Sequence, residues 1–357
     1  MNYEIVQAVE LPERPLPIVS IGAGGIVEDS HYPAYRKAGF AVTGLYDIKA
    51  SRAAEMSQKF NVPNVYKSIV EAVDQAPSNA IFDVAVPASA ILDVLQQLPD
   101  GRGVLIQKPM GETLAEARQI LDLCHTKNLT AAVNFQLRFA PVVVAARSLI
   151  QQGAIGEFHD MEVRMTVYTP WHLWSFLIGI PRMEILYHSI HYVDLMRSFL
   201  GEPQGVYAKT LKNPKQPQLS STRSNIILDY GDTLRANIET NHGHEFGRHH
   251  QESYVKWEGT QGAIKAQLGV NLNYPVGEAD TFEYCVLEAS QPPQWQAVSI
   301  NGTWFPDAFI GTMASLMRCI EGSSRELPTS VDEAFKTMAV VEAAYESSAH
   351  GATPIPE

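Results

Sequence analysis

The chain is poor in several features that mark particular classes of protein. Its 357 residues contain three cysteines, Cys124, Cys285 and Cys319, which lie far apart and form no Cys-x-x-Cys pair. Such a sparse, odd set argues against a disulfide framework and fits a reducing compartment. There is no long run of lysine and arginine, and the net charge is −12, so neither a nucleic acid nor an anionic membrane is an expected partner.

Long apolar runs are also missing. No uninterrupted apolar stretch reaches the length that crosses a membrane, and Met1–Pro17 carries three glutamates without the apolar core of a signal peptide. We therefore predict a cytoplasmic protein whose partner is a small-molecule substrate. Met1–Pro17 itself, with its prolines, is predicted to be an extended N-terminal arm that docks on its own domain or on a partner subunit; a disordered arm is the alternative.

Strand and helix patterns alternate from Ile18 to about Asn134. Short apolar runs suit parallel strands that are covered on both faces, and amphipathic segments separate them. Repeated strand–helix units imply right-handed crossovers, so we predict an α/β Rossmann-type, doubly wound parallel sheet over residues 18–136. The predicted strands are Ile18–Ile21, Ala41–Tyr46, Ile81–Val86, Gly103–Ile106 and Thr130–Asn134.

The pattern changes after Pro141. Several longer segments alternate apolar and polar residues with a period of two, which is typical of an antiparallel sheet with one covered face. We predict a second, α+β domain over residues 137–357, with a large, mostly antiparallel open sheet that binds substrate and joins subunits into a homo-oligomer, a dimer or a tetramer. Its predicted helices are Val142–Gln152, Glu184–Leu200, Phe309–Glu321 and Val331–His350.

A glycine-rich turn follows the first strand. Gly22, Gly24 and Gly25 lie between Ile18–Ile21 and the next helix, where backbone N–H groups and the helix N-terminus suit a pyrophosphate. Asp47 ends the second strand about 20 residues later, the place for a carboxylate that binds ribose hydroxyls. Val27 stands where the usual fingerprint has its third glycine. A tight turn without a ligand is the alternative; the combined pattern favours a dinucleotide.

Lys108 follows the fourth predicted strand, within Gln107-Lys108-Pro109. A residue in that position lies at the carboxyl edge of a parallel sheet, where ligands bind in open α/β folds. Pro109 restricts Lys108 to extended geometry and so fixes where its side chain points. The alternative is a solvated surface lysine.

These motifs together resemble the Gfo/Idh/MocA family of NAD(P)-dependent oxidoreductases. That family has Glu-Lys-Pro where this chain has Gln107-Lys108-Pro109, and its lysine assists proton transfer at the substrate carbon. Further similar motifs follow in the family's order, and the resemblance covers nearly all of the chain after the arm: Asn134–Pro141, Gly153–Glu157, Glu258–Gly262 and Ala343–Ser348. The cofactor-binding residues expected from the turn and the resemblance are Gly22, Gly24, Gly25, Ile26, Asp47, Arg52, Pro87, Gln107, Lys108 and Asn134.

A second group of chemical side chains lies in Tyr187–Asp194. On an α-helix, Tyr187, His191 and Asp194 share one face. The family reads Asp-x-Gly-x-His-x-x-Asp here, which implies proton transfer by His191, while Tyr187 replaces the first Asp and Ser189 replaces the Gly. We predict Lys108 and His191 as the proton-transfer residues, supported by Tyr187 and His188. A structural, hydrogen-bonded role is the alternative for His191.

Two histidine patterns raise the possibility of a metal. Glu184, His188 and His191 have helical spacing suited to ligation, but no fourth ligand is evident. Four histidines, His242, His244, His249 and His250, gather in one loop, for which a polar pocket mouth or a subunit contact is favoured. No metal is therefore predicted. Trp171 and His172, in the aromatic segment Thr169–Trp174, and Asp194 are candidate substrate contacts. For the aromatic segment, a hydrophobic cover for the core or an oligomer interface is the equal alternative.

The sequence therefore predicts reversible hydride transfer between a nicotinamide cofactor and a secondary or anomeric hydroxyl of a sugar, inositol or related polyol. Asp47 favours NAD, because a carboxylate repels a 2′-phosphate, although Lys49 and Arg52 would suit NADP. Two alternatives remain. One is a nucleotide-binding regulatory protein without catalysis, suggested by Tyr187 and Gln107. The other is a dehydrogenase or reductase of a non-sugar substrate, such as a dihydrodiol or an imine.

Overall fold

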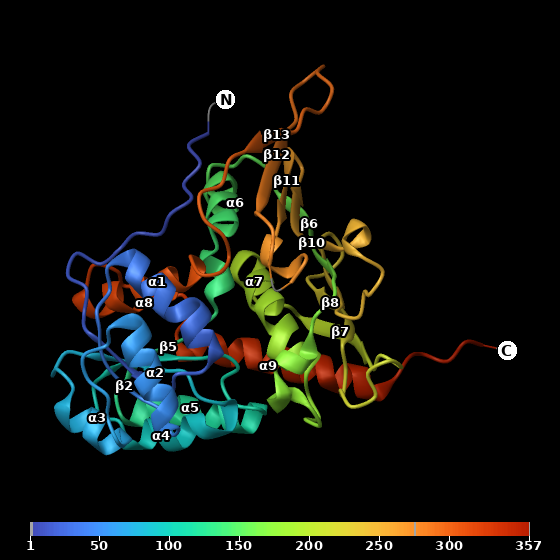
Figure 1. Ribbon diagram of the computed structural model, residues 1–357. Helices are drawn as coiled ribbons and strands as arrows, with labels where there is room; N and C mark the ends of the chain where they lie inside the picture. The colour runs from blue at the N-terminus through green and yellow to red at the C-terminus, as the bar shows by residue number, and fades with distance from the viewer. Residues whose placement is uncertain (1–2, 275, 357) are drawn as a thin grey trace. The chain divides into compact units, whose positions relative to one another are not determined.

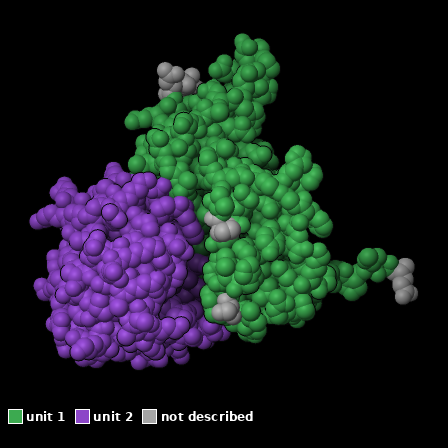
Figure 2. Space-filling view, viewed as in Figure 1, with its two compact units in different colours: residues 1–8, 141–304, 339–357 green, residues 9–140, 305–338 purple. Residues whose placement is uncertain are grey.

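The computed structural model describes residues 3–274 and 276–356. The chain divides into two compact units, which Figure 2 colours separately. One unit comprises residues 9–140 and 305–338, and the other comprises residues 1–8, 141–304 and 339–357. The first unit thus includes a segment, 305–338, that the sequence pattern had placed with the second domain.

The first unit is built on a five-stranded parallel sheet with the order β2-β1-β3-β4-β5. All five strands are short and mostly buried, as expected of strands covered on both faces. They are β1 (Ile18–Ile21), β2 (Val42–Tyr46), β3 (Ile81–Val84), β4 (Gly103–Ile106) and β5 (Thr130–Val133).

Helices cover both faces of this sheet (Figure 1). Apolar side chains of α1, α2 and α8 form one core with β1, β3, β4 and β5. In Figure 1, α4 and α5 lie along the opposite face. Two N-caps show why helices begin where they do: Ser68 Oγ accepts the Glu71 N–H, and Thr113 Oγ1 accepts the Glu116 N–H. The helices of this unit are α1 (Tyr32–Ala38), α2 (Ala50–Phe60), α3 (Ile69–Gln75), α4 (Ile91–Gln97), α5 (Leu114–Thr126) and α8 (Ala308–Glu321).

The second unit contains an eight-stranded sheet with the order β13-β12-β11-β10-β6-β9-β8-β7. Every neighbouring pair is antiparallel except β6 and β9, which are parallel. The strands are β6 (Phe158–Thr166), β7 (Gly205–Leu211), β8 (Arg223–Asp229), β9 (Arg235–Asn241), β10 (Glu252–Gly259), β11 (Gly262–Gln267), β12 (Thr281–Val286) and β13 (Gln296–Val298).

One face of this sheet is covered and the other is open. Burial alternates along β8 and β10, and α6 (Pro141–Gln151) and α7 (Ile190–Leu200) lie along the covered side in Figure 1. On the open face, Tyr207 and Ile227 are paired across β7 and β8 and are 64% and 49% exposed. The last helix, α9 (Val331–His350), contributes Ser347 and Ser348, whose hydroxyls accept the N–H groups of Ala208 and Thr210.

The predicted fold class, a doubly wound parallel sheet with a second, mostly antiparallel open sheet, is confirmed. The pattern missed β12 and β13 and did not anticipate the parallel pairing of β6 with β9. The described part of the arm, residues 3–17, forms no helix or strand. It is held to its own chain: the Glu4 N–H donates to Gln152 Oε1 at 3.1 Å, and the Arg14 N–H donates to Glu321 Oε2 at 3.2 Å. No helix among the described residues is both long enough and apolar enough to cross a membrane.

Candidate active site

The predicted cofactor residues meet at one edge of the parallel sheet. Each follows a different strand, and the carboxyl ends of parallel strands share an edge, where open α/β folds bind ligands. The strand order also changes direction between β1 and β3, the kind of switch point at which open α/β sheets bind ligands. The residues are Gly22–Ile26 after β1, Asp47 after β2, Pro87 after β3, Gln107 and Lys108 after β4, and Asn134 after β5.

Gly22 makes the sharp turn out of β1. Its φ is +101°, and a Cβ there would lie 2.3 Å from the carbonyl oxygen of Ala85. Its N–H donates to the Tyr46 carbonyl at 2.7 Å, so the turn is fixed against β2 and the segment after β3. A side chain at this position would therefore displace backbone.

Gly24 and Gly25 are glycines for which packing gives no reason. Both are exposed, and a Cβ on Gly24 would meet nothing within 4 Å. The bare backbone next to the start of a helix instead suits the close approach of a phosphate. The helical segment here contains a π-helical stretch, Val27–His31, in which the Tyr32 N–H donates to the Val27 carbonyl. The turn thus fits the pyrophosphate of a dinucleotide.

Asp47 and Arg52 are both tied to this turn. Asp47 Oδ2 accepts the Ala23 N–H and Oδ1 accepts the Lys49 N–H, each at 2.8 Å. The Arg52 Nε–H donates to the Ala23 carbonyl at 2.8 Å, and the guanidinium also pairs with Glu28 and Glu55. These hydrogen bonds, that to Glu28 first, raise the pKa of Arg52. The carboxylate is therefore held at the end of β2, and the nearby cation is already neutralised.

A buried polar network lies beneath the same edge of the sheet and was not predicted from the sequence. His31 Nδ1 is 2.8 Å from Asp83 Oδ2, which also accepts the Tyr35 hydroxyl at 3.0 Å. His31 Nε2 lies 3.2 Å from each of the amide nitrogens of Gln107 and Asn134. This pattern fits an imidazole with its proton on Nδ1. The overlooked signal was Asp83 itself, a carboxylate inside an apolar strand.

The network reaches the predicted catalytic lysine through Gln107. Gln107 Oε1 accepts the backbone N–H of Lys108 at 2.8 Å, while its amide nitrogen faces His31. Lys108 is partly buried, and burial lowers the pKa of its amine to about 8 because the charged form loses hydration. An amine with that pKa exchanges protons near neutral pH.

The second group of predicted residues lies in the other unit, where a π-helical stretch, Ile185–Ser189, leads into α7. The Ile190 N–H donates to the Ile185 carbonyl, five residues back. Tyr187 and His188 are partly buried, whereas His191 and Asp194 are 5% and 1% exposed. The His191 ring packs edge-on against Trp304, with 5.6 Å between ring centroids.

The aromatic segment after β6 lies partly in this region. Trp171 is buried, and its ring centroid is 4.8 Å from that of His242, which is 4.3 Å from that of His188. His172 is exposed. The structure therefore brings Trp171 near His188, and His242 is a neighbour that helical spacing alone did not select.

Comparison with known families agrees with this arrangement. Residues 16–135 match the family described as "Oxidoreductase family, NAD-binding Rossmann fold", and residues 147–356 match "Oxidoreductase family, C-terminal alpha/beta domain". The chain belongs to the Gfo/Idh/MocA family of oxidoreductases. The resemblance predicted from the motifs is thereby confirmed, and the unit with the glycine turn is the family's NAD-binding domain.

Individual Gfo/Idh/MocA relatives are distant. D-apiose dehydrogenase from Rhizobium rhizogenes is 26% identical over 258 residues, which cover 70% of this chain and 71% of the relative. D-apiose dehydrogenase from Paraburkholderia graminis is 21% identical, covering 92% and 87%. An oxidoreductase from Agrobacterium radiobacter, solved with NAD⁺, L-tartaric acid and magnesium, superposes with a TM-score of 0.79 at 19% identity, covering 95% of this chain and 98% of that one. At that identity the structural likeness describes the fold alone.

Proposed function

We propose that the protein catalyses reversible, NAD-dependent oxidation of a secondary or anomeric hydroxyl in a sugar, inositol or related polyol. The observation that carries the proposal is Lys108, an amine with a pKa of about 8 at the same strand edge as the glycine turn. The sugar substrates of the D-apiose dehydrogenases, at 26% and 21% identity, support this substrate class.

The chemistry requires a hydride acceptor and a proton acceptor. When bound, the nicotinamide ring supplies the first, by taking the hydride from the alcohol carbon. Neutral Lys108 takes the hydroxyl proton during oxidation, and protonated Lys108 returns it during reduction. His191 assists the proton transfer, with Tyr187 and His188 in supporting roles. Gln107 and the His31–Asp83 pair act as positioning residues, because they hold the backbone from which Lys108 extends.

NAD is the proposed cofactor rather than NADP. The Asp47 carboxylate is fixed by two backbone N–H groups, so it stays where a 2′-phosphate would have to bind. Arg52, the cation that would compensate, is already paired with Glu28 and Glu55. We expect NADP⁺ to bind at least tenfold more weakly than NAD⁺ in a calorimetric titration. Asp47→Ser should reduce the difference in affinity between NAD⁺ and NADP⁺. Tighter binding of NADP⁺ than of NAD⁺ by the wild-type protein would contradict the assignment of NAD as the cofactor.

Catalysis is tested with a panel of aldoses, inositols and polyols, following NADH formation by its absorbance. Lys108→Met should lower kcat by at least about 100-fold on any compound that turns over, because a positioned proton acceptor contributes about 10²–10⁴-fold. Lys67→Met, which removes an exposed lysine of the same unit, is the matched control and should leave kcat unchanged.

Three outcomes would each contradict the proposal or one part of it. If NAD⁺ binds but no compound of the panel turns over, the protein is better described as a nucleotide-binding regulator. If turnover is found and Lys108→Met leaves kcat unchanged, the protein is an oxidoreductase but Lys108 is not its proton acceptor. Turnover confined to dihydrodiols or imines added to the panel would overturn the substrate class alone.

A further inference from the structure

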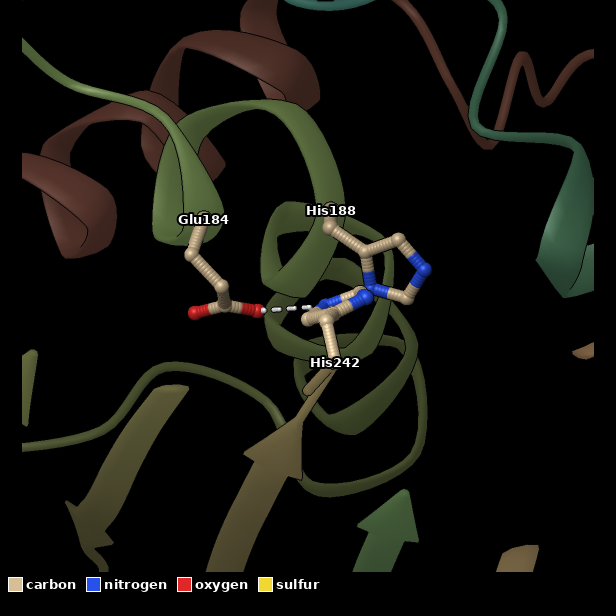
Figure 3. A group of neighbouring side chains, drawn as sticks. All are labelled: Glu184, His188 and His242. Atoms are coloured by element: carbon tan, nitrogen blue, oxygen red, sulfur yellow. Dashed lines mark ion pairs between the residues drawn. The ribbon is translucent and has the colours of Figure 1, made fainter. Parts of the chain in front are cut away.

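Three side chains of the second unit bring possible metal-ligating atoms together. They are Glu184, His188 and His242, and one ligating atom of each lies within 4.8 Å of the others (Figure 3). His188 lies in the π-helical stretch and Glu184 is the residue immediately before it, whereas His242 follows β9. Within residues 3–274 and 276–356, no other group of three His, Cys, Asp or Glu side chains meets this spacing.

This cluster is buried, which sets it apart from ordinary surface charges. Glu184 and His242 are both 0% exposed, and His188 is partly buried. The rings of Trp171 and Tyr192 lie beside the two imidazoles, with centroid distances of 4.8 Å to His242 and 5.5 Å to His188. A carboxylate taken out of water in this way needs compensating positive charge or hydrogen bonds.

The distance between Glu184 and His242 is informative. Glu184 Oε1 and His242 Nε2 are 3.4 Å apart, longer than the roughly 2.7–2.9 Å of a charge-assisted hydrogen bond. The buried pair of His31 and Asp83 in the same chain closes to 2.8 Å. Two ligands of a tetrahedral zinc ion, each about 2.0–2.1 Å from the metal, lie about 3.4 Å apart. Glu184 and His242 thus have the separation of two ligands on one ion.

Neighbouring hydroxyls orient two of the three groups. Thr169 Oγ1 lies 2.8 Å from His242 Nδ1, so a proton on Nδ1 leaves the lone pair of Nε2 directed at Glu184. The Ser189 hydroxyl donates to Glu184 Oε1 at 2.6 Å. Such outer hydrogen bonds are typical of metal sites, where they fix the tautomer and the rotamer of each ligand.

We propose that Glu184, His188 and His242 bind one divalent transition-metal ion, and that Zn²⁺ suits them best. Two imidazoles and a carboxylate match zinc and its first-row neighbours rather than Mg²⁺ or Ca²⁺, which prefer all-oxygen shells. Three protein ligands leave the fourth tetrahedral position to water or another small oxygen ligand, the pattern of an open zinc site. The ligand set differs from the one that helical spacing suggested, because His242 takes the place of His191.

The test is metal binding by the full-length, tag-free chain without cofactor or substrate, so its result is independent of the proposed oxidoreductase activity. After treatment with a chelator, the protein is titrated with Zn²⁺ by calorimetry, and Co²⁺ is added separately as a spectroscopic probe. We expect one Zn²⁺ per chain and the intense visible absorption of tetrahedral Co²⁺. Glu184→Gln and His242→Gln should each weaken Zn²⁺ binding at least about 100-fold.

The control is the double variant His249→Gln/His250→Gln, which removes two imidazoles from the neighbouring loop and should bind Zn²⁺ normally. Thr169→Val keeps all three ligands and should weaken binding by about 10–100-fold, so the proposal stays testable if a ligand variant fails to fold. Wild-type protein without saturable Zn²⁺ binding would overturn the proposal. So would loss of binding in the loop variant with retention in His242→Gln.

Discussion

Two histidine–aspartate pairs in the NAD-binding unit provide a direct measure of how burial changes the cost of losing one partner. His31 and Asp83 are 2.8 Å apart with side chains that are 0% exposed. His125 and Asp332 are 3.1 Å apart with side chains that are 56% and 59% exposed. We predict that His31→Leu destabilises the protein far more than His125→Leu does.

The magnitude follows from what each substitution leaves behind. Removing one partner of a buried pair costs about 3–5 kcal/mol, because the other charge stays buried. His31→Leu also takes the acceptor away from the amides of Gln107 and Asn134, so we expect a loss of at least about 4 kcal/mol. His125→Leu removes a solvated pair and should cost about 0–1 kcal/mol.

A double substitution tests the cause. Replacing both partners with apolar residues removes the stranded charge, and such replacements are often nearly neutral. His31→Leu/Asp83→Val should therefore be more stable than His31→Leu alone, even though it carries one more change. An isosteric Asp83→Asn keeps an acceptor for Nδ1–H and should cost about 1–2 kcal/mol.

The assay must report on the correct unit. All five tryptophans lie in residues 141–304, outside the NAD-binding unit, so their fluorescence follows the other unit. Urea unfolding is therefore followed by far-UV circular dichroism, together with hydrogen exchange of amides in β1, β3 and β4. Equal free-energy losses for His31→Leu and His125→Leu, or a double variant less stable than His31→Leu, would refute the reasoning.

Three further predictions concern the turn, the lysine and the open sheet. Gly22→Ala should weaken NAD⁺ binding at least tenfold and lower the melting temperature, since its Cβ would lie 2.3 Å from a carbonyl oxygen; calorimetry and thermal denaturation check this. If neutral Lys108 is the base, as proposed, kcat for oxidation should rise with pH and level off above about 8, and kcat for reduction should fall over the same range. In steady-state pH profiles, the Lys108→Met variant should show neither the rise of kcat for oxidation nor the fall of kcat for reduction. If the open sheet joins subunits, Tyr207→Glu should convert the homo-oligomer to monomers in light scattering, and an unchanged mass would contradict this.

Much of the fold was predictable because local patterns agree with the final packing. Ile18–Ile21, Gly103–Ile106 and Val331–His350 have the same bounds in the structure as in the sequence prediction. Each shows a clear period or a strong stop signal. β13 was missed because this short edge strand, Gln296–Val298, has no buried face and hence no apolar alternation.

The site was predictable wherever a residue directly follows a strand. Chain direction alone places Asp47, Gln107 and Asn134 at the carboxyl edge. The sequence did not predict the neighbours of His31 and His242, because their positions depend on contacts between segments far apart in the sequence. The π-helical stretches also escaped prediction, since a hydrogen bond to the fifth residue back leaves no periodic mark over a single turn.

The position of β6 has a consequence for how the second unit assembles. β6 is the first strand of its sheet to leave the ribosome, yet it pairs with β9 and β10, which are made some 70 residues or more later. Until then it has no hydrogen-bonding neighbour on either side, and its exposed edges are open to pairing with other chains. The later strands form two meanders, β7–β9 and β10–β13, that close around it from opposite sides. The sheet of this unit can therefore form only late in synthesis, through pairings between strands far apart in the sequence. The yield of native protein then depends on how well the unpaired edges of β6 are kept from pairing with other chains until β9 and β10 have been made.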